Sequence, residues 1–301
     1  MRIRDSVTAA EPAATAAANL APADPRRALR RRPDLERYLV RADLPAWQRA
    51  LRYRAAQLVV WIYGHLLFRL SLEGAEHVVD GPALYCFNHL GWLDPLAMLA
   101  AFPARVRLYF YGPQEQDLRH GAKNRLMWWT GIAVPFSPSK DDLITSVRRA
   151  QSVFESGGAL AIAGEGRIHV HEGDLLPFQE GAAYLALRAR VPIVPVAITG
   201  TSWIRFRGEI RIRLGEPIET GPRPTREVVT AYTARLWHVI KAMVTDDHDR
   251  PPPGRVERWF SDAFNDWGPG GREAAALVRG PRPEDVPLPP LPSDTAEAVR
   301  R

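Results

Sequence analysis

Short apolar runs that alternate with helical segments constrain this chain more than any other feature. The runs of strand length are residues 83–87, 106–111, 132–136, 159–163 and 193–198, with a more exposed strand at 209–214. Helical spacing of apolar residues is found over 95–101, 141–155, 181–189 and 225–244. Strands separated by helices predict an α/β fold, in which a mostly parallel central sheet is flanked by helices.

Local signals predict several element boundaries. Asp94 is expected to cap the helix that has Pro95 at its first position, because both residue types favour helix starts. Ser139 is expected to cap the helix over 141–155. Prolines 192 and 195 predict that the last apolar strand lies at an edge or lines a groove, because proline cannot donate to a sheet.

The chain divides into four segments by composition. Residues 1–42 are rich in Ala, Pro and Arg and predict a disordered basic arm, and residues 43–72 form an amphipathic helical segment. Residues 73–245 hold the alternating α/β pattern. Residues 246–301 predict a poorly ordered Pro-rich tail with one aromatic segment, which either docks on the core or touches a membrane.

The amphipathic segment admits two interpretations. Leu51, Leu58, Ile62 and Leu66 recur at helical spacing, and arginines flank them. Such a helix either covers the core or lies in a membrane interface with its arginines at lipid phosphates. The longest apolar run, residues 55–68, is shorter than the roughly 20 residues that a membrane span needs.

Charge and cysteine content limit the classes of partner. The formal net charge is +6, which suits a phosphate-bearing partner, either nucleic acid or an anionic membrane surface. Because the arginines do not cluster with aromatic residues in a nucleic-acid-binding module, no nucleic acid is expected. The single cysteine, Cys86, excludes an internal disulfide framework.

The strongest chemical signal lies in residues 88–95, which read NHLGWLDP. His89 and Asp94 follow a predicted strand and precede a helix, so they lie at the carboxyl end of a strand, where open α/β sheets bind ligands. On one continuous helix the two side chains would diverge by about 140°, whereas a turn lets them meet. An Asp that accepts from one ring nitrogen leaves the other basic. The alternative is a simple helix cap beside a loop histidine.

Three later motifs give this pair a context. Residues 164–167 read GEGR after the strand at 159–163, residues 176–183 read LPFQEGAA, and residues 191–196 read VPIVPV. The amide of Gly166 is a candidate for contacting an oxyanion, and Arg167 offers two parallel donors to a phosphate. Glu165 either contacts the acceptor or braces the loop.

In this order the motifs resemble the glycerolipid acyltransferases related to bacterial 1-acylglycerol-3-phosphate acyltransferase, over residues 72–220. The resemblance implies an acyltransferase domain over 73–245, with Asn88, His89 and Asp94 in its N-H-x-x-x-x-D block. It implies that His89 acts as general base on a lipid hydroxyl and that Asp94 orients it. The donor would be acyl-CoA or acyl carrier protein, and no other cofactor is expected.

The second family block departs from the pattern. An arginine that helps to bind the acceptor phosphate in the family is missing after residues 131–136, and Ser137 stands near its place. Lys140 is the first candidate to replace it, followed by Lys123 and Arg125. Ser137 and Lys140 are therefore included among the expected substrate-binding residues with Asn88, Glu165, Gly166 and Arg167.

His169, His171 and Glu172 resemble a metal-ligand spacing, but no cysteine pairs or further ligands support it. A polar loop beside the active site is the preferred interpretation, and no metal is expected.

The prediction is an enzyme of phospholipid synthesis that acylates a lysophospholipid or glycerol phosphate at the cytoplasmic face of a membrane, as a peripheral or monotopic protein. The alternatives are a thioesterase that uses the same site and a catalytically silent lipid-binding or adaptor protein.

Overall fold

The computed structural model describes residues 38, 40–113, 122–136, 140–221 and 223–290, and their seven strands form one sheet in the order β1-β7-β6-β2-β5-β3-β4. The strands are β1 (Arg69–Glu73), β2 (Leu84–Phe87), β3 (Leu108–Pro113), β4 (Ala133–Phe136), β5 (Ala159–Ala163), β6 (Ile193–Thr199) and β7 (Glu209–Leu214). Neighbouring strands run parallel except β6 and β7. The predicted mostly parallel sheet is confirmed.

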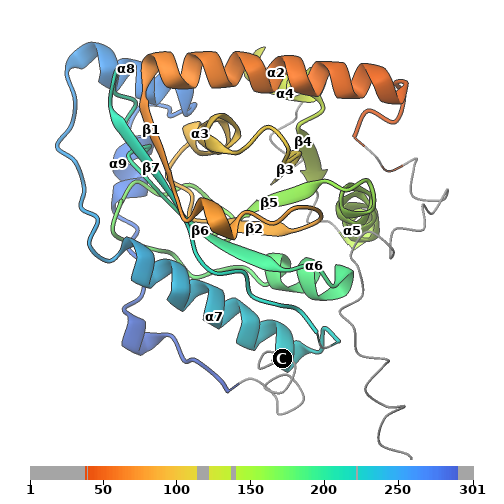
Figure 1. Cartoon of the computed structure of the whole chain (residues 1–301). Helices are drawn as coiled ribbons and strands as arrows, with labels where there is room; N and C mark the ends of the chain where they lie inside the picture. The colour runs from red at the N-terminus through yellow and green to blue at the C-terminus, as the bar shows by residue number, and fades with distance from the viewer. Residues whose placement is uncertain (1–37, 39, 114–121, 137–139, 222, 291–301) are drawn as a thin grey trace, which may run out of the picture.

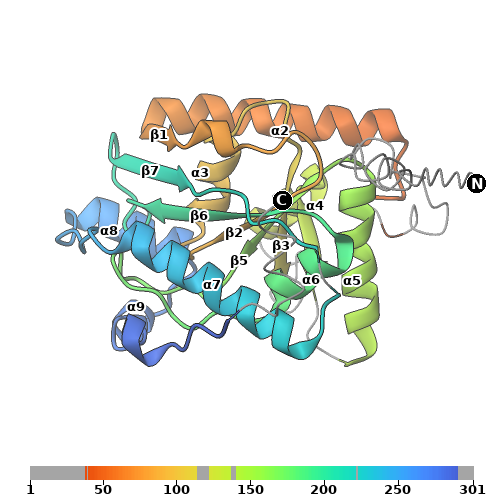
Figure 2. The ribbon, with the colours of Figure 1, turned by 60° about the horizontal axis from the view of Figure 1, so that its bottom comes forward.

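Helices cover both faces of this sheet, as Figures 1 and 2 show. One layer contains α2 (Ala46–Leu67), α3 (Leu93–Ala101) and α4 (Ala122–Thr130). The other contains α5 (Lys140–Glu155), α6 (Gly181–Ala189) and α7 (Arg226–Val244). The tail contains the helices α8 (Arg255–Phe264) and α9 (Gly271–Ala276). Two short 3-10 turns are formed by Ala75–His77, between β1 and β2, and by Pro283–Asp285, after α9.

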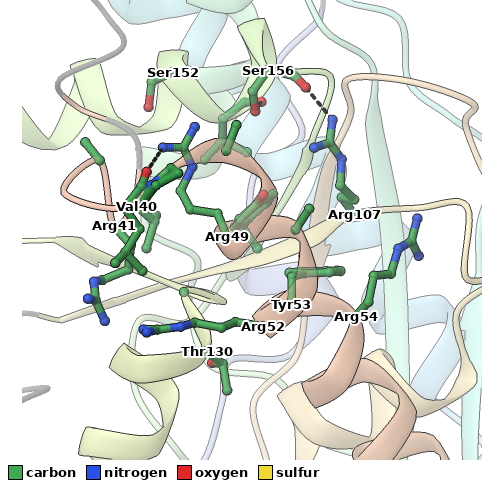
Figure 3. Close-up of a pocket in the computed structure, with 18 of the residues that line it drawn as sticks. Val40, Arg41, Arg49, Arg52, Tyr53, Arg54, Arg107, Thr130, Ser152 and Ser156 are labelled. Atoms are coloured by element: carbon green, nitrogen blue, oxygen red, sulfur yellow. Dashed lines mark hydrogen bonds between the residues drawn. The ribbon is translucent and has the colours of Figure 1, made fainter.

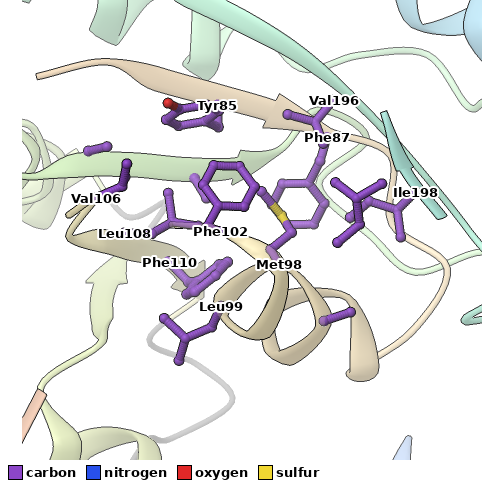
Figure 4. Packing of buried hydrophobic residues seen from close by; sticks show 14 of the residues in the cluster. Tyr85, Phe87, Met98, Leu99, Phe102, Val106, Leu108, Phe110, Val196 and Ile198 are labelled. Carbon is purple, nitrogen blue, oxygen red and sulfur yellow. The ribbon is translucent and has the colours of Figure 1, made fainter. Parts of the chain in front are cut away.

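Burial on both faces explains why the central strands are continuous apolar runs. Along β2, Tyr85 and Phe87 point into the core on the α3 side, whereas Leu84 and Cys86 point into the core on the α7 side. Figure 4 shows Tyr85 and Phe87 packed with Phe102 and Met98 from the α3 segment. Because β2 lies mid-sheet with both faces covered, the turn that follows it starts from a fixed position.

The segment 43–72 is only partly helical. The helix α2 ends at Leu67, Phe68 takes an extended conformation, and β1 begins at Arg69. This strand pairs in parallel with β7, beginning with Arg69 opposite Glu209. A partner about 140 residues away in the chain leaves no local signal, which is why the periodicity did not predict a strand here.

Pro195 does not mark an edge strand, because β6 lies between β7 and β2. Ile193 exchanges two backbone hydrogen bonds with Ile218, and the carbonyl of Pro195 accepts from Gly215 N at 2.9 Å. Val196 then pairs with Leu214. The segment from Leu214 to Ile218 therefore contains one residue more than the segment from Ile193 to Val196 that it faces. This extra residue forms a bulge opposite Pro195, so the N–H that proline lacks costs the sheet no hydrogen bond.

The predicted poorly ordered tail is corrected over residues 246–290, which hold α8 and α9 packed against the α/β domain. Ser261 Oγ accepts from Ile204 N at 2.8 Å, and Arg272 donates to Ser202 O at 2.7 Å. Both bonds join residues far apart in the sequence, so composition alone could not predict the docking. Residues 291–301, and nearly all of the predicted basic arm, lie outside the described residues.

Within the described part of the chain, no helix combines the length and apolar character needed to cross a membrane.

Candidate functional site

Asn88 is the first residue after β2, and its fully buried side chain continues the sheet where the backbone turns away. Its Oδ1 accepts from Ile198 N at 2.7 Å, and its Nδ2 donates to Ile198 O at 2.9 Å. Both ends of the amide are therefore occupied by one residue of β6. The expectation that Asn88 binds substrate is corrected, because this amide instead fixes the position of the turn.

His89 is held through its backbone and through one ring nitrogen. Its N–H donates to Glu165 Oε1 at 2.9 Å, and its carbonyl accepts from His169 N at 3.0 Å. Its Nδ1 lies 2.8 Å from Asp94 Oδ2. The ring also rests edge-on against Phe87, with centroids 5.7 Å apart. The side chain is 18% exposed, and Nε2 has no hydrogen-bond partner among the described residues.

Asp94 is completely buried and gathers three donors on one oxygen. Its Oδ2 accepts from His89 Nδ1, from Leu90 N at 2.7 Å and from Gly91 N at 3.0 Å. A carboxylate that accepts three bonds fixes the proton of His89 on Nδ1 and leaves the lone pair on Nε2. The predicted meeting of His89 and Asp94 across the turn is what the structure shows.

The helix cap was predicted at the wrong residue. The helix α3 begins at Leu93, so Asp94 lies within its first turn and Trp92 is the N-cap. The carboxylate folds back over the preceding turn and bonds the amides of Leu90 and Gly91, which come before the helix. The side chain therefore orders the His89 turn rather than the helix end.

Glu165 lies just after β5 and braces the same turn from its other side. Its Oε1 accepts from His89 N, and its Oε2 accepts from Leu176 N at 2.8 Å and lies 2.8 Å from His169 Nε2. It is buried, with both oxygens occupied. Of the two roles considered for Glu165, bracing the loop agrees with this geometry and contact with the acceptor does not.

The next two residues behave differently from each other. The amide of Gly166 donates to Ala163 O at 3.2 Å inside a tight turn with a φ of +68°, so it is not free to bind an oxyanion, and that expectation is corrected. Arg167 is exposed, and its side chain forms no hydrogen bond or ion pair with any described residue. It remains a candidate anion ligand beside His89.

None of the side chains expected to replace the missing arginine belongs to the described part of the structure. Ser137 lies outside the described residues, as does the predicted cap Ser139, and Lys140 opens α5 with its side chain outside the description. The side chains of Lys123 and Arg125 on α4 are likewise not described.

The histidines at 169 and 171 have separate partners. His171 Nδ1 lies 2.7 Å from Asp249 Oδ2, and its Nε2 lies 3.0 Å from Ala276 O. Both partners of His171 belong to the tail, so this side chain fastens the tail to the loop after β5. Glu172 instead accepts from Gly200 N at 2.7 Å and from Ser202, and its burial raises its pKa. No metal-binding cluster of His, Cys, Asp or Glu occurs among the described residues.

Sequence reasoning missed a contact from the tail. Asn265, at the end of α8, accepts from Trp92 N at 2.7 Å, and its Nδ2 donates to Ser261 O at 2.8 Å. A side chain on Gly91 would place its Cβ 2.8 Å from Asn265 Oδ1, so the glycine permits this close approach. The tail thus supports the His89 turn directly, and no motif around residue 265 signalled it.

Together these contacts present one imidazole nitrogen without a partner among the described residues, on a turn whose backbone amides are held by Glu165, Asp94 and Asn265. Such a nitrogen can take a proton from a hydroxyl, because an imidazole nitrogen that carries a lone pair can act as a general base. Cys86 offers no competing nucleophile, since it is fully buried on the other face of β2 and burial raises the pKa of its thiol.

Comparisons with known proteins agree on one family. A family model described as Acyltransferase matches residues 69–199. The 1-acyl-sn-glycerol-3-phosphate acyltransferase of Limnanthes douglasii is 28% identical over 164 residues, which cover 52% of this chain and 53% of that protein. The chain thus spans about half the length of this relative. The alpha form from Homo sapiens is 27% identical over 201 residues, 62% of this chain and 68% of its own.

A solved structure shows the same fold. The 1-acyl-sn-glycerophosphate (LPA) acyltransferase PlsC from Thermotoga maritima aligns with a TM-score of 0.52 and 19% sequence identity, over 67% of this chain and 83% of that one. The region matched by the family model holds His89, Asp94 and Glu165 and ends with β6. Asn265 and the rest of the docked tail lie beyond it.

Proposed function

This chain belongs to the glycerolipid acyltransferase family, and on that premise we propose that it moves a fatty acyl group from acyl-CoA or acyl carrier protein to the hydroxyl of a lysophospholipid or glycerol phosphate. The observation that carries the proposal is the geometry of His89. Its Nδ1 is fixed by Asp94, and its Nε2 has no partner among the described residues at the edge where parallel sheets place ligands.

The reaction follows from that geometry. His89 Nε2 takes the proton of the acceptor hydroxyl while the oxygen attacks the thioester carbonyl, and the buried Asp94 carboxylate stabilises the imidazolium that forms. Collapse of the tetrahedral intermediate forms the ester and breaks the carbon–sulfur bond. The imidazolium returns the proton to the leaving thiolate, so the enzyme regains its starting state. No cofactor beyond the acyl donor enters this scheme.

Arg167 is the proposed anion ligand of this site. The turn that carries it is joined to the His89 strand by the bond from Gly164 N to Phe87 O and by the bond from His169 N to His89 O. Both substrates carry phosphate in the proposed reaction, and a guanidinium offers phosphate two parallel hydrogen bonds.

A membrane surface is the proposed working place, at its cytoplasmic face, with the protein peripheral or monotopic. The outer side of α2 exposes large apolar side chains, among them Leu58, Trp61, Ile62, Tyr63 and Leu66. Exposed apolar rows of this size on a helix favour burial in a lipid interface, where Trp and Tyr are also enriched.

The helix α8 adds a second apolar surface near the site. Val256, Trp259 and Phe260 recur at helical spacing on its outer side, and Trp259 is 69% exposed. The rings of Phe260 and Phe206 lie 6.0 Å apart, and Phe206 belongs to the loop before β7. The next residue of this loop, Arg207, donates its backbone N–H to Leu67 O at the end of α2. Figures 1 and 2 both place α8 and the end of α2 at the same end of the molecule. A lipid acceptor would then reach His89 from this surface.

The test is a transfer assay with acyl-CoA and a panel of lysophospholipids, in which free thiol and acylated lipid are both followed. We expect equal amounts of thiol and acylated lipid, and a rate about 10²–10⁴-fold lower for His89→Ala, the range for loss of a general base. His248→Ala removes an exposed histidine and serves as the control. Thiol release without acylated lipid would identify a thioesterase, and full transfer by His89→Ala would disprove the mechanism.

A further inference from the structure

A cavity of about 790 Å³ lies at the amino ends of the strands, opposite to the carboxyl ends where His89 lies, and Figure 3 shows residues that line it. Its walls come from the start of α2, from the residue before β3 and from the end of α5. Arg107 immediately precedes β3, and Ser156 lies three residues before β5, so the cavity sits at the amino ends of these strands. The proposed acyl transfer makes no use of it.

Positive charge dominates the lining. The arginines of the cavity are Arg41, Arg49, Arg52, Arg54 and Arg107, and Glu155 is the acidic residue among the described lining residues. Arg41 is paired with Asp43, whereas no described carboxylate lies within ion-pair distance of Arg49, Arg54 or Arg107. Their guanidiniums donate instead to neutral oxygens. Arg49 donates to Leu44 O, Arg54 donates to Ala104 O and to the side-chain amide oxygen of Gln57, and Arg107 donates to Ser156 O.

These three arginines line the cavity together with two aromatic residues. The two residues are Tyr53 and Tyr109, whose rings lie 5.5 Å apart. Burial raises the pKa of Tyr109, and the positive charges of Arg107, Arg49 and Arg54 oppose that shift. Like charges held together beside buried rings repel one another, so an anion in the cavity would relieve them.

The rim shows which kind of anion fits. Arg52 lies over the ring of Trp129 with 5.0 Å between the guanidinium carbon and the ring centroid, and Trp129 lines the cavity. Trp47, Leu51 and Leu126 are large exposed apolar residues on the two helices that border it. Arginine and tryptophan together on an apolar rim are typical of the lipid headgroup region. An inorganic phosphate ion, which has no apolar part, would gain nothing from this rim.

We propose that Arg49, Arg54 and Arg107 bind the phosphate of an anionic phospholipid headgroup. This inference rests on the membrane association proposed above, and it adds a specific lipid site at the start of α2. The exposed apolar side of α2 then runs between two contacts with the membrane, the arginine pocket at its beginning and α8 at its end. The pocket would select anionic membranes, and α8 would face the acceptor.

The experiment measures sedimentation of the full chain with vesicles of phosphatidylglycerol and of phosphatidylcholine. The test variant is Arg49→Gln/Arg54→Gln/Arg107→Gln. Its matched control, Arg188→Gln/Arg223→Gln/Arg226→Gln, removes the same charge from exposed positions on α6, on α7 and just before α7, across the sheet from α2. We expect binding to phosphatidylglycerol vesicles to weaken roughly 100-fold in the test variant and less than about threefold in the control.

A second variant separates charge from folding. Arg49→Lys/Arg54→Lys/Arg107→Lys keeps the three charges and is expected to bind within about threefold of wild type, with equal thermal stability of all variants as the folding check. Equal losses in the test and control variants would overturn the proposal, since any three surface charges would then suffice. His89→Ala should bind both kinds of vesicle normally, so a failed mechanism and a failed lipid site give different results.

Two further arms identify the source of the phosphate. Inorganic phosphate and adenosine 3′,5′-bisphosphate are added as soluble competitors, and we expect neither to release the protein at concentrations that match the vesicle phosphate. Tight binding of either one, lost in the test variant while vesicle binding stays intact, would assign the pocket to a soluble phosphate compound and overturn the lipid site. Intact vesicle binding with activity lost only for the acyl carrier protein donor would assign the pocket to an acidic protein and would likewise overturn the lipid site.

Discussion

The carboxyl ends and the amino ends of the central strands, called here the carboxyl edge and the amino edge of the sheet, are built in opposite ways. At the carboxyl edge the polar groups around His89 are paired with one another: Asn88 with Ile198, Glu165 with His89 N and Leu176 N, and Asp94 with three donors. At the amino edge, three arginines face an open cavity and donate to neutral oxygens. Hydrogen bonds between neighbouring groups hold the His89 ring in place, whereas the arginine charges, which no described carboxylate neutralises, provide affinity for an anion from outside. The preorganised histidine and the arginines that attract an anion thus lie at opposite edges.

The largest expected effect comes from Asp94→Asn, which breaks the organisation of the carboxyl edge. The new amide would donate toward His89 Nδ1 and favour the tautomer whose Nε2 carries the proton, so kcat should fall about 10²–10⁴-fold. Initial rates at saturating donor and acceptor measure it, with the surface residue Asp80→Asn as control. The double variant with His89→Ala should be no slower than His89→Ala alone, and additive losses would contradict a joint role.

Glu165→Gln is expected to have the next largest effect. Its amide group would face donors at His89 N or Leu176 N, so one buried N–H loses its acceptor. We expect the free energy of unfolding to fall by about 1–3 kcal/mol. Chemical denaturation measures this, and Glu180→Gln on the exposed start of α6 is the matched control. An unchanged stability would mean that Glu165 does not brace the turn.

Asn265→Ala tests the reach of the tail into the site. Loss of the acceptor for Trp92 N should lower kcat about tenfold with little change in KM, equivalent to about 1.4 kcal/mol in the transition state. Asn265→Asp keeps the acceptor oxygen and should retain most of the activity even if it is less stable. If both variants lose activity in proportion to their stability, the contact is only structural.

The smallest effect is expected for Asp249→Asn, at the other fastening of the tail. Burial raises the pKa of Asp249, but the hydrogen bonds from His171 and Glu172 N outweigh this and hold it below its usual value. A carboxyl with a lowered folded pKa stabilises the protein above its unfolded pKa of about 3.9, and the contribution is lost as the pH falls through the folded pKa. Thermal unfolding should therefore distinguish variant from wild type at neutral pH and no longer at strongly acidic pH. An equal difference at both would contradict the linkage.

All four substitutions act at the carboxyl edge or in the tail, so they should leave binding to anionic vesicles intact. The arginine variants should do the reverse, with normal transfer to a detergent-dispersed acceptor. A variant of one edge that impaired both properties would show that the two edges are coupled.

Much of the fold was predictable because the signals are local. Each expected apolar run over 83–214 contains a strand, and Thr225 caps α7 by accepting from Val228 N. The errors arose where a distant partner decides the outcome. The strand β1 exists because β7 pairs with it, and Pro195 is tolerated mid-sheet because the chain after β7 bulges.

The candidate site divides in the same way. His89, Asp94 and Arg167 were identified from their positions after apolar runs, and the first two meet as predicted. The roles of Asn88 and Gly166 were misjudged, because a motif gives the residue type at a position but not the partner of its hydrogen bonds. The contact between Trp92 and Asn265 joins residues 173 positions apart and has no sequence signal.

By itself the sequence determined the parallel α/β sheet, the strand-to-helix turn that holds His89 five residues before Asp94, and the resemblance that names the chemistry. These features depend on neighbours in the chain, whose spacing is fixed by covalent geometry. Only the tertiary structure decided that the tail supports the His89 turn and that Arg107 lines one cavity with Arg49 and Arg54 of α2. Such convergence depends on how strands and helices pack, which no spacing along the chain encodes.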